Sequence, residues 1–468
     1  MANIRSRFVL AATVAGSALP LSGIGSPVSP GKPNVVIILA DDMGYGDISC
    51  YNSKQVKTPH IDKLAKNGVR FTDFYVPTPY CAPSRATLLT GRFPLNHGLV
   101  QNPAPDAGIN DVGIAADEIT LGNVFQGAGY RTKCIGKWHL GHKPEYFPVN
   151  HGFDEYFGIL YSNDMRPVQL IENRDTVEYP VDQQFLTQKY TRKAVEFITI
   201  NKNKPFYLHL CHAMPHKPLA ASARFYTPET PGDLYADVIR ELDWSVGEII
   251  KTLKKLNLLG NTIVIFMSDN GPWYGGSSGG FKGMKATNWE GGIRVPVIIS
   301  YPKVLPENTK IAIPCWSPDI FPTLLSLTNI SVQSPNKLDG SDLTEIMKGK
   351  QHTHQPVFSM HNNRLMTVRQ GDWKLFIHNP GYFKMVDLKT WKDPRAPDGT
   401  TIIAPVTGQA TPASYPGIIP VQSENEIQLY NLREDPAESK DLSGVHPEIV
   451  NELLQEIKKF EASFTEKN

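Results

Sequence analysis

The sequence predicts an α/β protein with a mostly parallel central sheet flanked by helices, followed by a smaller C-terminal α+β part with an antiparallel sheet. Continuous apolar runs such as VVIILA (35–40) and TIVIFM (262–267) are typical of strands buried on both faces of a parallel sheet. Amphipathic stretches separate these runs, as in βα units. After about residue 350 the apolar residues alternate instead, as in paired antiparallel strands.

Each element has a local signal in the chain. Pro33 and an acidic loop bound the first strand, 34–40, and Gly68 separates a short helix from a strand within 58–71. The further predicted elements are a helix, a glycine stop and a strand over 118–141, a helix, a turn and a strand over 188–216, an amphipathic helix over 234–260 closed by Gly260, antiparallel strands over 356–379 around a Gln-Gly-Asp turn, a loop over 390–422, a strand over 427–432 and a helix over 447–461. We therefore expect a large domain over 31–350 and a smaller one over 351–468.

The N-terminus has the pattern of an export signal. Arg5 and Arg7 precede an apolar run, 8–21, that is too short to span a bilayer, and small residues follow. We expect a signal peptide over 1–28; a disordered or weakly anchored N-terminus is the alternative. No other segment has 18 uninterrupted apolar residues, so we expect an exported protein without a membrane span, periplasmic or secreted, or lysosomal in a eukaryote. The single sequon at 329–331 and the simple signal favour a bacterial exported protein.

Charge and cysteine content exclude some functions. The formal net charge is +1, so no field of one sign indicates nucleic acid or anionic lipid as a partner. Five cysteines in 468 residues are not a disulfide scaffold, and no C-x-x-C pair indicates a dithiol redox motif or a thiolate zinc site.

Polar side chains follow four of the predicted strands. They are Asp41 and Asp42 after VVIILA, Lys137 and His139 after RTKCIG, His212 and His216 after FYLHL, and Asp269 and Asn270 after TIVIFM. Ligands bind at the carboxyl ends of strands in open α/β sheets. Each group alone could be a helix cap, a turn or a structural histidine, but four such endings together predict a site.

The oxygen ligands among these residues indicate a hard divalent cation. Three carboxylates and one amide, from Asp41, Asp42, Asp269 and Asn270, suit Ca²⁺ or Mg²⁺. Cys81 lies in a segment that would complete the site, yet a thiolate is a poor partner for such an ion. A free cysteine is most often a small buried hydrophobe. If Cys81 instead belongs to the cation site, the mismatch between its sulfur and a hard ion indicates that residue 81 is not a cysteine in the working protein.

The stretch CAPSRATLLTGR (81–92) resembles the C-x-P-S-R-xxx-L-T-G-R signature of type I sulfatases. Further stretches that resemble sulfatase blocks are GYRTKCIGKWHLG (129–141), ILADDMGYGD (38–47), SDNG (268–271), KATNWEGG (285–292) and LYNLREDPAESKDL (429–442). The resemblance implies an alkaline phosphatase-like fold, with 31–350 as the catalytic domain, and a sulfuric ester hydrolase. It is closest to the branch that contains arylsulfatase A-like and galactose- or N-acetylgalactosamine-sulfate enzymes.

The resemblance also implies residue roles. A separate maturation enzyme would convert Cys81 to Cα-formylglycine, whose hydrated diol would hold one Ca²⁺ with Asp41, Asp42, Asp269 and Asn270. One diol oxygen would attack sulfur, and loss of sulfate from the resulting sulfo-enzyme would restore the aldehyde. Arg85 would steady the diol, Lys137 and His139 would form the K-x-H pair with His139 as the base, and His212 and Lys285 would act at the leaving group. The candidate substrate contacts are Ser162, His216, Asn163, Asp164 and Arg166.

Two other functions are open from the sequence. One is a formylglycine-dependent phosphodiester or phosphonate hydrolase of the same superfamily. The other is a non-catalytic binding protein on a decayed scaffold, which the complete set of motif residues argues against. For the sulfatase, the expected substrate is a sulfated galactose or N-acetylgalactosamine residue at a glycan chain end. The sequence does not distinguish which hydroxyl carries the sulfate.

Overall fold

The computed structural model describes residues 31–53, 56–165, 168–226, 234–273, 275–332, 336–380 and 425–465. The predicted signal peptide and the loop over 390–422 lie outside these residues. Residues 32–468 form one unit. Among the residues described, no helix combines the length and the apolar character that a membrane crossing requires.

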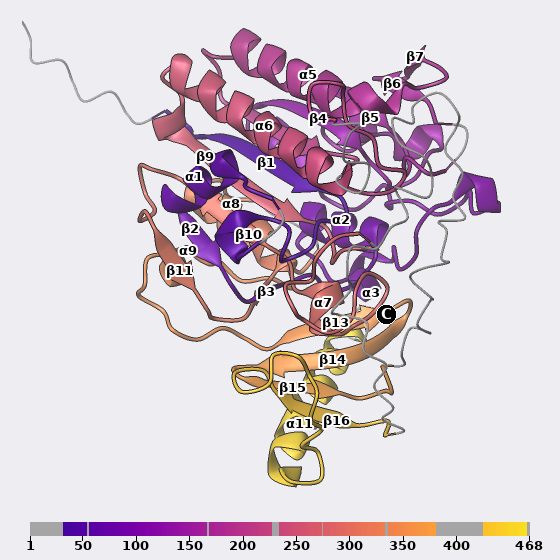
Figure 1. Cartoon of the computed structure of the whole chain (residues 1–468), viewed down its shortest axis with the longest axis vertical. Coiled ribbons are helices and arrows are strands. Elements are labelled where there is room, and N and C mark those ends of the chain that lie inside the picture. Colours follow the sequence, from indigo (N-terminus) through magenta and orange to yellow (C-terminus); the bar gives the residue numbers. More distant parts are fainter. Residues whose placement is uncertain are drawn as a thin grey trace, which may run out of the picture. The chain divides into compact units, whose positions relative to one another are not determined.

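A ten-stranded sheet forms the centre of this unit (Figure 1). Its strand order is β11-β2-β10-β9-β1-β8-β4-β5-β6-β7, and the five strands from β9 to β5 are parallel. The strands are β1 (Asn34–Ala40), β2 (Val69–Phe71), β4 (Arg131–Lys137), β5 (Glu155–Ile159), β6 (Leu170–Glu172), β7 (Asp175–Glu178), β8 (Phe206–Cys211), β9 (Thr262–Ser268), β10 (Val297–Ser300) and β11 (Thr309–Ile311). The predicted α/β class and mostly parallel sheet are confirmed.

Helices cover both faces of this sheet. Alternate residues of β1 point to opposite sides: Val35 and Ile37 enter one apolar core and Val36 and Ile38 the other. The helices α1, α5 and α6 pack on the second core, and α2, α4 and α8 on the first. The helix bounds are α1 (Pro59–Lys66), α2 (Cys81–Thr90), α3 (Pro94–His97), α4 (Leu121–Gly127), α5 (Leu186–Ile200), α6 (Leu234–Lys255), α7 (Glu290–Ile293), α8 (Ile320–Thr328), α9 (Thr344–Met347) and α11 (Pro447–Thr465). Burial of strands on both faces explains their continuous apolar sequence.

A four-stranded antiparallel sheet follows in the C-terminal part, as predicted. Its strands are β13 (Val357–His361), β14 (Arg364–Gln370), β15 (Trp373–Phe376) and β16 (Gln428–Asn431), paired in that order, and a separate two-stranded pair joins β3 (Phe74–Tyr75) to β12 (Cys315–Trp316). The predicted Gln-Gly-Asp turn connects β14 to β15, with Gly371 at φ 57°. Buried ion pairs tie this sheet to the larger one, including Arg369 to Asp73 at 2.7 Å and Lys374 to Glu290 at 3.0 Å.

One element end differs from the prediction. The long helix expected over 234–260 ends at Lys255, and a short 3-10 turn, Leu259–Asn261, precedes β9. Asn257 adopts φ 58° and supplies the left-handed residue that Gly260 was expected to provide. Asparagine tolerates this conformation better than most residues, so it can end a helix as glycine does.

Candidate active site

Two neighbouring parallel strands bring the predicted acidic residues together. β1 and β9 are paired along their whole length, so Asp41 and Asp42 emerge beside Asp269 and Asn270. The backbone N–H of Asp42 donates to Asp269 Oδ1 at 3.1 Å, and the side-chain amide of Asn270 donates to Asp42 Oδ1 at 2.8 Å. Asp42 adopts φ 61°, a sharp turn that directs the chain away from the sheet. All four side chains are buried.

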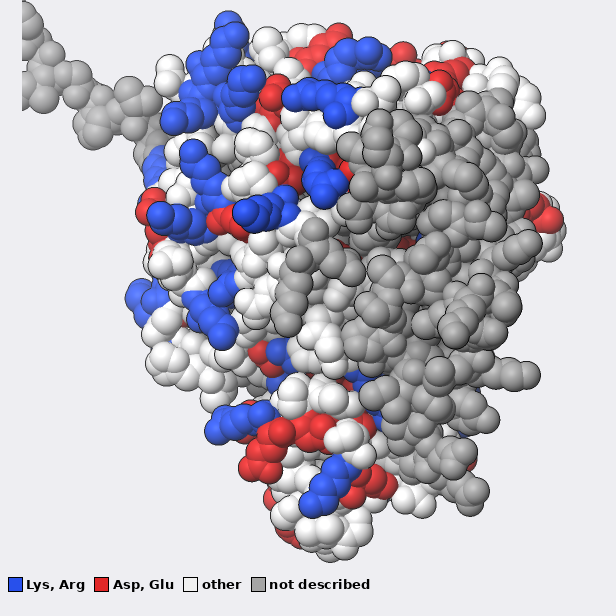
Figure 2. Space-filling model, in the orientation of Figure 1, with Lys and Arg blue, Asp and Glu red and all other residues white. Residues whose placement is uncertain are grey.

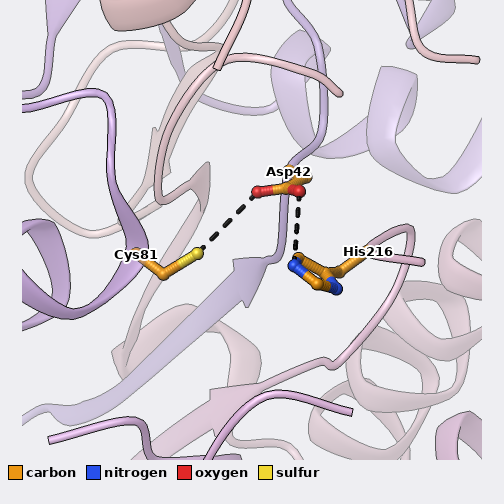
Figure 3. A group of neighbouring side chains, drawn as sticks. All are labelled: Asp42, Cys81 and His216. Atoms are coloured by element: carbon orange, nitrogen blue, oxygen red, sulfur yellow. Dashed lines mark hydrogen bonds and ion pairs between the residues drawn. The ribbon is translucent and has the colours of Figure 1, made fainter. Parts of the chain in front are cut away.

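Cys81 begins α2 and points at this acidic group. Its Sγ lies 3.6 Å from Asp41 Oδ1 and 3.9 Å from Asp42 Oδ1, and Figure 3 shows Asp42 between Cys81 and His216. Ser84, one turn along α2, donates to the backbone oxygen of Asp269 at 2.6 Å and fixes the helix against β9. Burial raises the pKa of the Cys81 thiol, so an unmodified thiol here stays protonated and is a weak nucleophile.

Three cations neutralise the three carboxylates. Arg85 donates through Nε and Nη2 to Asp269 Oδ2 at 2.9 and 2.7 Å, and through Nη1 to the backbone oxygen of Lys137 at 2.9 Å. Lys137 Nζ lies 2.6 Å from Asp41 Oδ2. Lys285 Nζ lies 2.8 Å from Asp42 Oδ1 and 3.2 Å from Cys81 Sγ. A buried charge is tolerated only when it is paired in this way.

Burial and the neighbouring charges shift the carboxylates in opposite directions. Burial alone would raise the pKa of Asp41, but the charges of Lys137 and Arg85 outweigh it and hold this pKa well below its usual range. For Asp269, burial and the nearby carboxylate of Asp41 outweigh the effect of Arg85 and raise the pKa to about 7. A pair of carboxylates whose pKa values diverge is typical of a functional site.

The donor set fits a hard divalent cation. Ligand atoms of Asp41, Cys81 and Asp269 lie within 4.8 Å of one another, and so do those of Asp42, Cys81 and His216. Asn270 Oδ1 is buried and has no hydrogen-bond partner among the described residues, although a buried amide oxygen needs one. A cation bound between these oxygens would supply that partner. The sulfur of Cys81 remains the one poor ligand.

The lone pair of His139 is on its Nδ1 atom. Its Nε2 lies 3.1 Å from the backbone oxygen of Pro103, which can only accept, so Nε2 carries the proton. Nδ1 is buried and has no hydrogen-bond partner within the described part of the chain. Burial first, and then the charges of Lys137 and Arg85, lower the pKa of His139 well below its usual value. His139 is therefore a neutral imidazole, as a base must be.

His216, rather than His212, lies at the cluster. His216 Nε2 is 3.6 Å from Asp42 Oδ2, and its Nδ1 lies 2.7 Å from the backbone oxygen of Lys217. His212 Nε2 instead lies 3.1 Å from Ser245 Oγ of α6, on the face of the sheet that α5 and α6 cover, and no contact joins it to Cys81 or Asp42 among the described residues. The prediction that put His212 near the leaving group is therefore corrected. His212 directly follows β8, whereas the chain must travel four residues further to reach Asp42.

The other predicted substrate contacts lie in different positions relative to the cluster. Ser162 accepts from Lys137 Nζ at 3.0 Å and lies 3.4 Å from His216 Nε2, so it belongs to the cluster. Asn163 Oδ1 lies 2.9 Å from His216 Nδ1, which makes Asn163 a support for that ring. Asp164 is half-buried and close enough to act on the pKa of His216. Arg166 lies outside the described residues.

Two residues beside the cluster carry no signal in the sequence. Tyr80, just before Cys81, hydrogen-bonds through its hydroxyl to His361 Nε2 at 3.1 Å. Both side chains are partly exposed, and Lys285 lies near enough to affect the pKa of Tyr80. His361 ends β13 of the C-terminal sheet, 281 residues along the chain from Tyr80. The C-terminal part thus reaches the edge of the site.

The C-terminal sheet also holds the loop that carries Lys285. Lys374 on β15 donates to the backbone oxygen of Asn288 at 2.8 Å and pairs with Glu290 and Glu438 at 3.0 and 2.8 Å. Glu438 accepts from the backbone N–H of Glu290 at 2.7 Å. Asn288 and Glu290, which follow Lys285 in its loop, are therefore fixed by the C-terminal part. The block LYNLREDPAESKDL contains Glu438, but its sequence does not say what it contacts.

The fold and these contacts define a class of protein. Three carboxylates, Cys81 and two lysines meet at the carboxyl edge of a mostly parallel sheet. In an α/β fold, this arrangement suits the hydrolysis of an anionic ester.

Comparison with known proteins gives the family. The model of the Sulfatase family matches residues 33–330. N-acetylgalactosamine-6-sulfatase of Sus scrofa is 36% identical over 389 residues, which cover 76% of this chain and 74% of that protein. Arylsulfatase G of Rattus norvegicus is 34% identical over 484 residues, which cover 91% and 85%. A solved Bacteroides thetaiotaomicron structure, from work on its metabolism of multiple glycosaminoglycans, has a TM-score of 0.77 and 26% identity and covers 92% of this chain and 99% of that chain.

The chain belongs to the sulfatase family and is a sulfuric ester hydrolase.

Proposed function

We propose that this sulfatase removes sulfate from a galactose or N-acetylgalactosamine residue at the end of a glycan, using a formylglycine made from Cys81 and one Ca²⁺. The observation that carries the proposal is the position of Cys81. It is buried among three carboxylates and three cations, where a protonated thiol can neither attack nor bind a hard ion. An aldehyde hydrate at this position would supply oxygen in place of sulfur.

The absent groups would supply defined chemistry. Ca²⁺ held by Asp41, Asp42, Asp269 and Asn270 would polarise a sulfate oxygen, and the hydrated formylglycine would supply a nucleophilic hydroxyl and a second hydroxyl for releasing sulfate. Asn270 Oδ1 receives no hydrogen bond from any residue that the structure describes, which supports the ion. The maturation enzyme would act on the stretch from Cys81 to Arg85 before folding, since the folded chain buries it.

The two lysines would bind the sulfate. Lys137 and Lys285 neutralise Asp41 and Asp42 in the absence of the ion. A divalent cation on the same carboxylates would release both ammonium groups, which then can face the anionic oxygens of the substrate. Arg85 is held by Asp269 and by the backbone of Lys137, so it keeps its place at residue 81 throughout. Arg85 and Lys137 are buried and Lys285 is partly buried, which strengthens their interaction with developing charge.

The two histidines would move protons. His139 presents the Nδ1 lone pair and accepts the proton of the remaining hydroxyl when sulfate is released. His216 faces Asp42 with Nε2 and donates to the leaving oxygen once an anion at the site has raised its affinity for a proton. Asn163 and the backbone of Lys217 hold the His216 ring in this orientation.

The relatives support a glycan substrate. One is named N-acetylgalactosamine-6-sulfatase, and a structural neighbour comes from work on glycosaminoglycan metabolism. Tyr80 and His361 flank the cluster and offer an aromatic face and a hydrogen-bonding nitrogen to a sugar.

The export and domain predictions remain proposals. We propose that 1–28 are removed as an export signal, so that the mature chain acts in a periplasm, a lysosome or outside the cell, and that the catalytic domain ends near residue 350. Sequencing the N-terminus of the exported protein tests the first of these.

Substrate profiling of matured enzyme tests the proposed function. The protein is produced together with a formylglycine-generating enzyme and assayed on the 6-sulfates of N-acetylgalactosamine and galactose, on N-acetylgalactosamine 4-sulfate, on a sulfated glucosamine and on an aryl phosphodiester. We expect the highest kcat/KM on a galactose-configured sulfate. A preference for the glucosamine sulfate would overturn the sugar assignment, and a preference for the phosphodiester would overturn the proposed reaction.

A further inference from the structure

A second polar cavity lies on the β2 and β11 edge of the large sheet. Its volume is about 540 Å³, within the range of small-ligand sites. Its walls come from the segment after β1, from β2 and β11, and from the β14–β15 turn of the C-terminal sheet. The lining residues that matter here are Tyr45, Asn52, Arg70, Lys310, Asp372 and Arg433. None of them belongs to the Cys81 cluster.

Two cations stand side by side in this cavity. Arg70 on β2 and Lys310 on β11 are direct partners in the strand register, so their side chains share one face of the sheet. No hydrogen bond or ion pair joins either side chain to another residue in the described part of the chain; the guanidinium of Arg70 lies over the ring of Tyr51, 5.4 Å from its centre. Like charges on adjacent strands repel each other, and an anion between them would remove that repulsion.

The carboxylates nearby are already occupied. Asp73 pairs with Arg294 at 3.0 Å and with Arg369 at 2.7 Å. Asp372 pairs with Arg433 at 2.7 Å. Among the residues that the structure describes, five cations and two carboxylates line the cavity, which leaves an excess of positive charge at Arg70 and Lys310. Figure 2 shows lysine and arginine side chains over the same side of the molecule as α1, α6, β2 and β11 in Figure 1.

The cavity at the β2 and β11 edge adjoins another polar cavity. That neighbour has a volume of about 450 Å³ and shares Arg369, Asp372 and Arg433 with the first. It adds hydrogen-bonding side chains from His352, Thr353, Gln355 and Gln370. Together the two cavities offer a cation pair beside a longer polar groove, the combination that a sulfated sugar chain would need.

We propose that this cleft is a second saccharide site, in which Arg70 and Lys310 bind the sulfo group of a sulfated glycan. The proposal rests on the proposed function, because it takes the ligand to be the same class of polymer that the catalytic cluster trims. Tyr45 and Asn52 lie at the wall of the cavity, where a ring and an amide can contact a sugar. The site would hold the polymer near the enzyme and would take no part in the chemistry.

Binding to the Cys81→Ala full-length protein tests the proposal without turnover. Isothermal titration calorimetry uses a defined chondroitin 6-sulfate oligosaccharide, the unsulfated oligosaccharide and sodium sulfate as probes. The same titrations are made with Arg70→Gln/Lys310→Gln in this background. The matched control is Lys202→Gln/Lys204→Gln, which removes the same charge from exposed lysines that follow α5. Without the Cys81 change, both double variants are also assayed on a small aryl sulfate.

We expect the sulfated oligosaccharide to show two binding events on the Cys81→Ala protein and on the Lys202→Gln/Lys204→Gln control in that background. In Arg70→Gln/Lys310→Gln, one of these events should be lost or weakened by roughly tenfold or more. Activity of that pair on the aryl sulfate should stay within about twofold of the parent, since two exposed or half-buried cations outside the cluster are changed. Equal losses in the control would show non-specific attraction and overturn the proposal. So would equal binding of the unsulfated oligosaccharide, or binding of sodium sulfate without the sulfated oligosaccharide. Failure of the proposed function would appear separately, as absence of aryl sulfate hydrolysis in the parent enzyme.

Discussion

Replacement of His216 and of His212 separates a catalytic from a structural histidine. His216 Nε2 faces Asp42 at 3.6 Å and lies beside Ser162, whereas His212 Nε2 bonds Ser245 on α6. The two residues are four positions apart and both are buried. We expect His216→Ala to lower kcat strongly, and His212→Ala to lower stability with little loss of activity.

The contacts set the expected magnitudes. Loss of a positioned proton donor lowers the rate roughly 100- to 10,000-fold, which is the effect expected for His216→Ala. His212→Ala removes one neutral hydrogen bond and leaves a cavity, which together destabilise the protein by about 2–4 kcal/mol. Ser245 Oγ keeps its bond to Thr191 Oγ at 2.6 Å, so no hydroxyl is left unpaired. His212→Ala should therefore retain activity within roughly tenfold at a temperature well below its Tm.

The assay is sulfate release from an aryl sulfate and from a sulfated sugar, with Tm measured on the same preparations. The aryl sulfate carries a good leaving group and needs less proton donation, so His216→Ala should lose more activity on the sugar. A larger loss in His212→Ala than in His216→Ala, with both proteins folded, would refute the assignment. Equal losses of His216→Ala on both substrates would refute the role of His216 at the leaving oxygen.

Three further outcomes are expected. EGTA should abolish activity and lower Tm, with Ca²⁺ restoring both, because ligand binding to the native state stabilises it; unchanged activity after exhaustive chelation would contradict the cation site. Lys374→Met should lower the free energy of unfolding by about 3–5 kcal/mol, because it leaves the buried carboxylates of Glu290 and Glu438 without this cation. It should also lower kcat/KM by at least the equivalent factor, because the loop that carries Lys285 loses its support. The exposed Lys350→Met control should change the free energy of unfolding by less than about 1 kcal/mol. Burial first, and then the charge of Arg92, lower the pKa of His97 to about 3, below its unfolded value, so its contribution to stability is present above about pH 6.5 and is lost as pH falls toward 3; His97→Gln should flatten the dependence of Tm on pH in that window, and an unchanged slope would contradict this.

The sequence predicted the elements whose pattern is local. Strands β1 and β9 are apolar throughout, so their positions and the acidic residues after them followed from periodicity and from the rule for parallel sheets. The choice between His212 and His216 did not follow, because it depends on how far the loop after β8 must run to reach Asp42.

Contacts between remote segments were also beyond the sequence. Tyr80 and His361 are 281 residues apart, and Lys374 supports Lys285 through backbone atoms of Asn288. Neither pair lies within one motif, so only the packing of the C-terminal sheet against the loops of the large sheet brings them together. Arg70 and Lys310 likewise become neighbours only through the β2–β11 register.

The mass of the tryptic peptide Phe71–Arg85 tests the central claim most directly. The peptide contains Cys81, and protein for the measurement is made together with a formylglycine-generating enzyme. Conversion of Cys81 to formylglycine predicts a loss of mass equal to the difference between CH₂SH and CHO at residue 81, and a loss of sulfate release in Cys81→Ala. An unmodified thiol in protein that hydrolyses sulfate esters at full rate would contradict it.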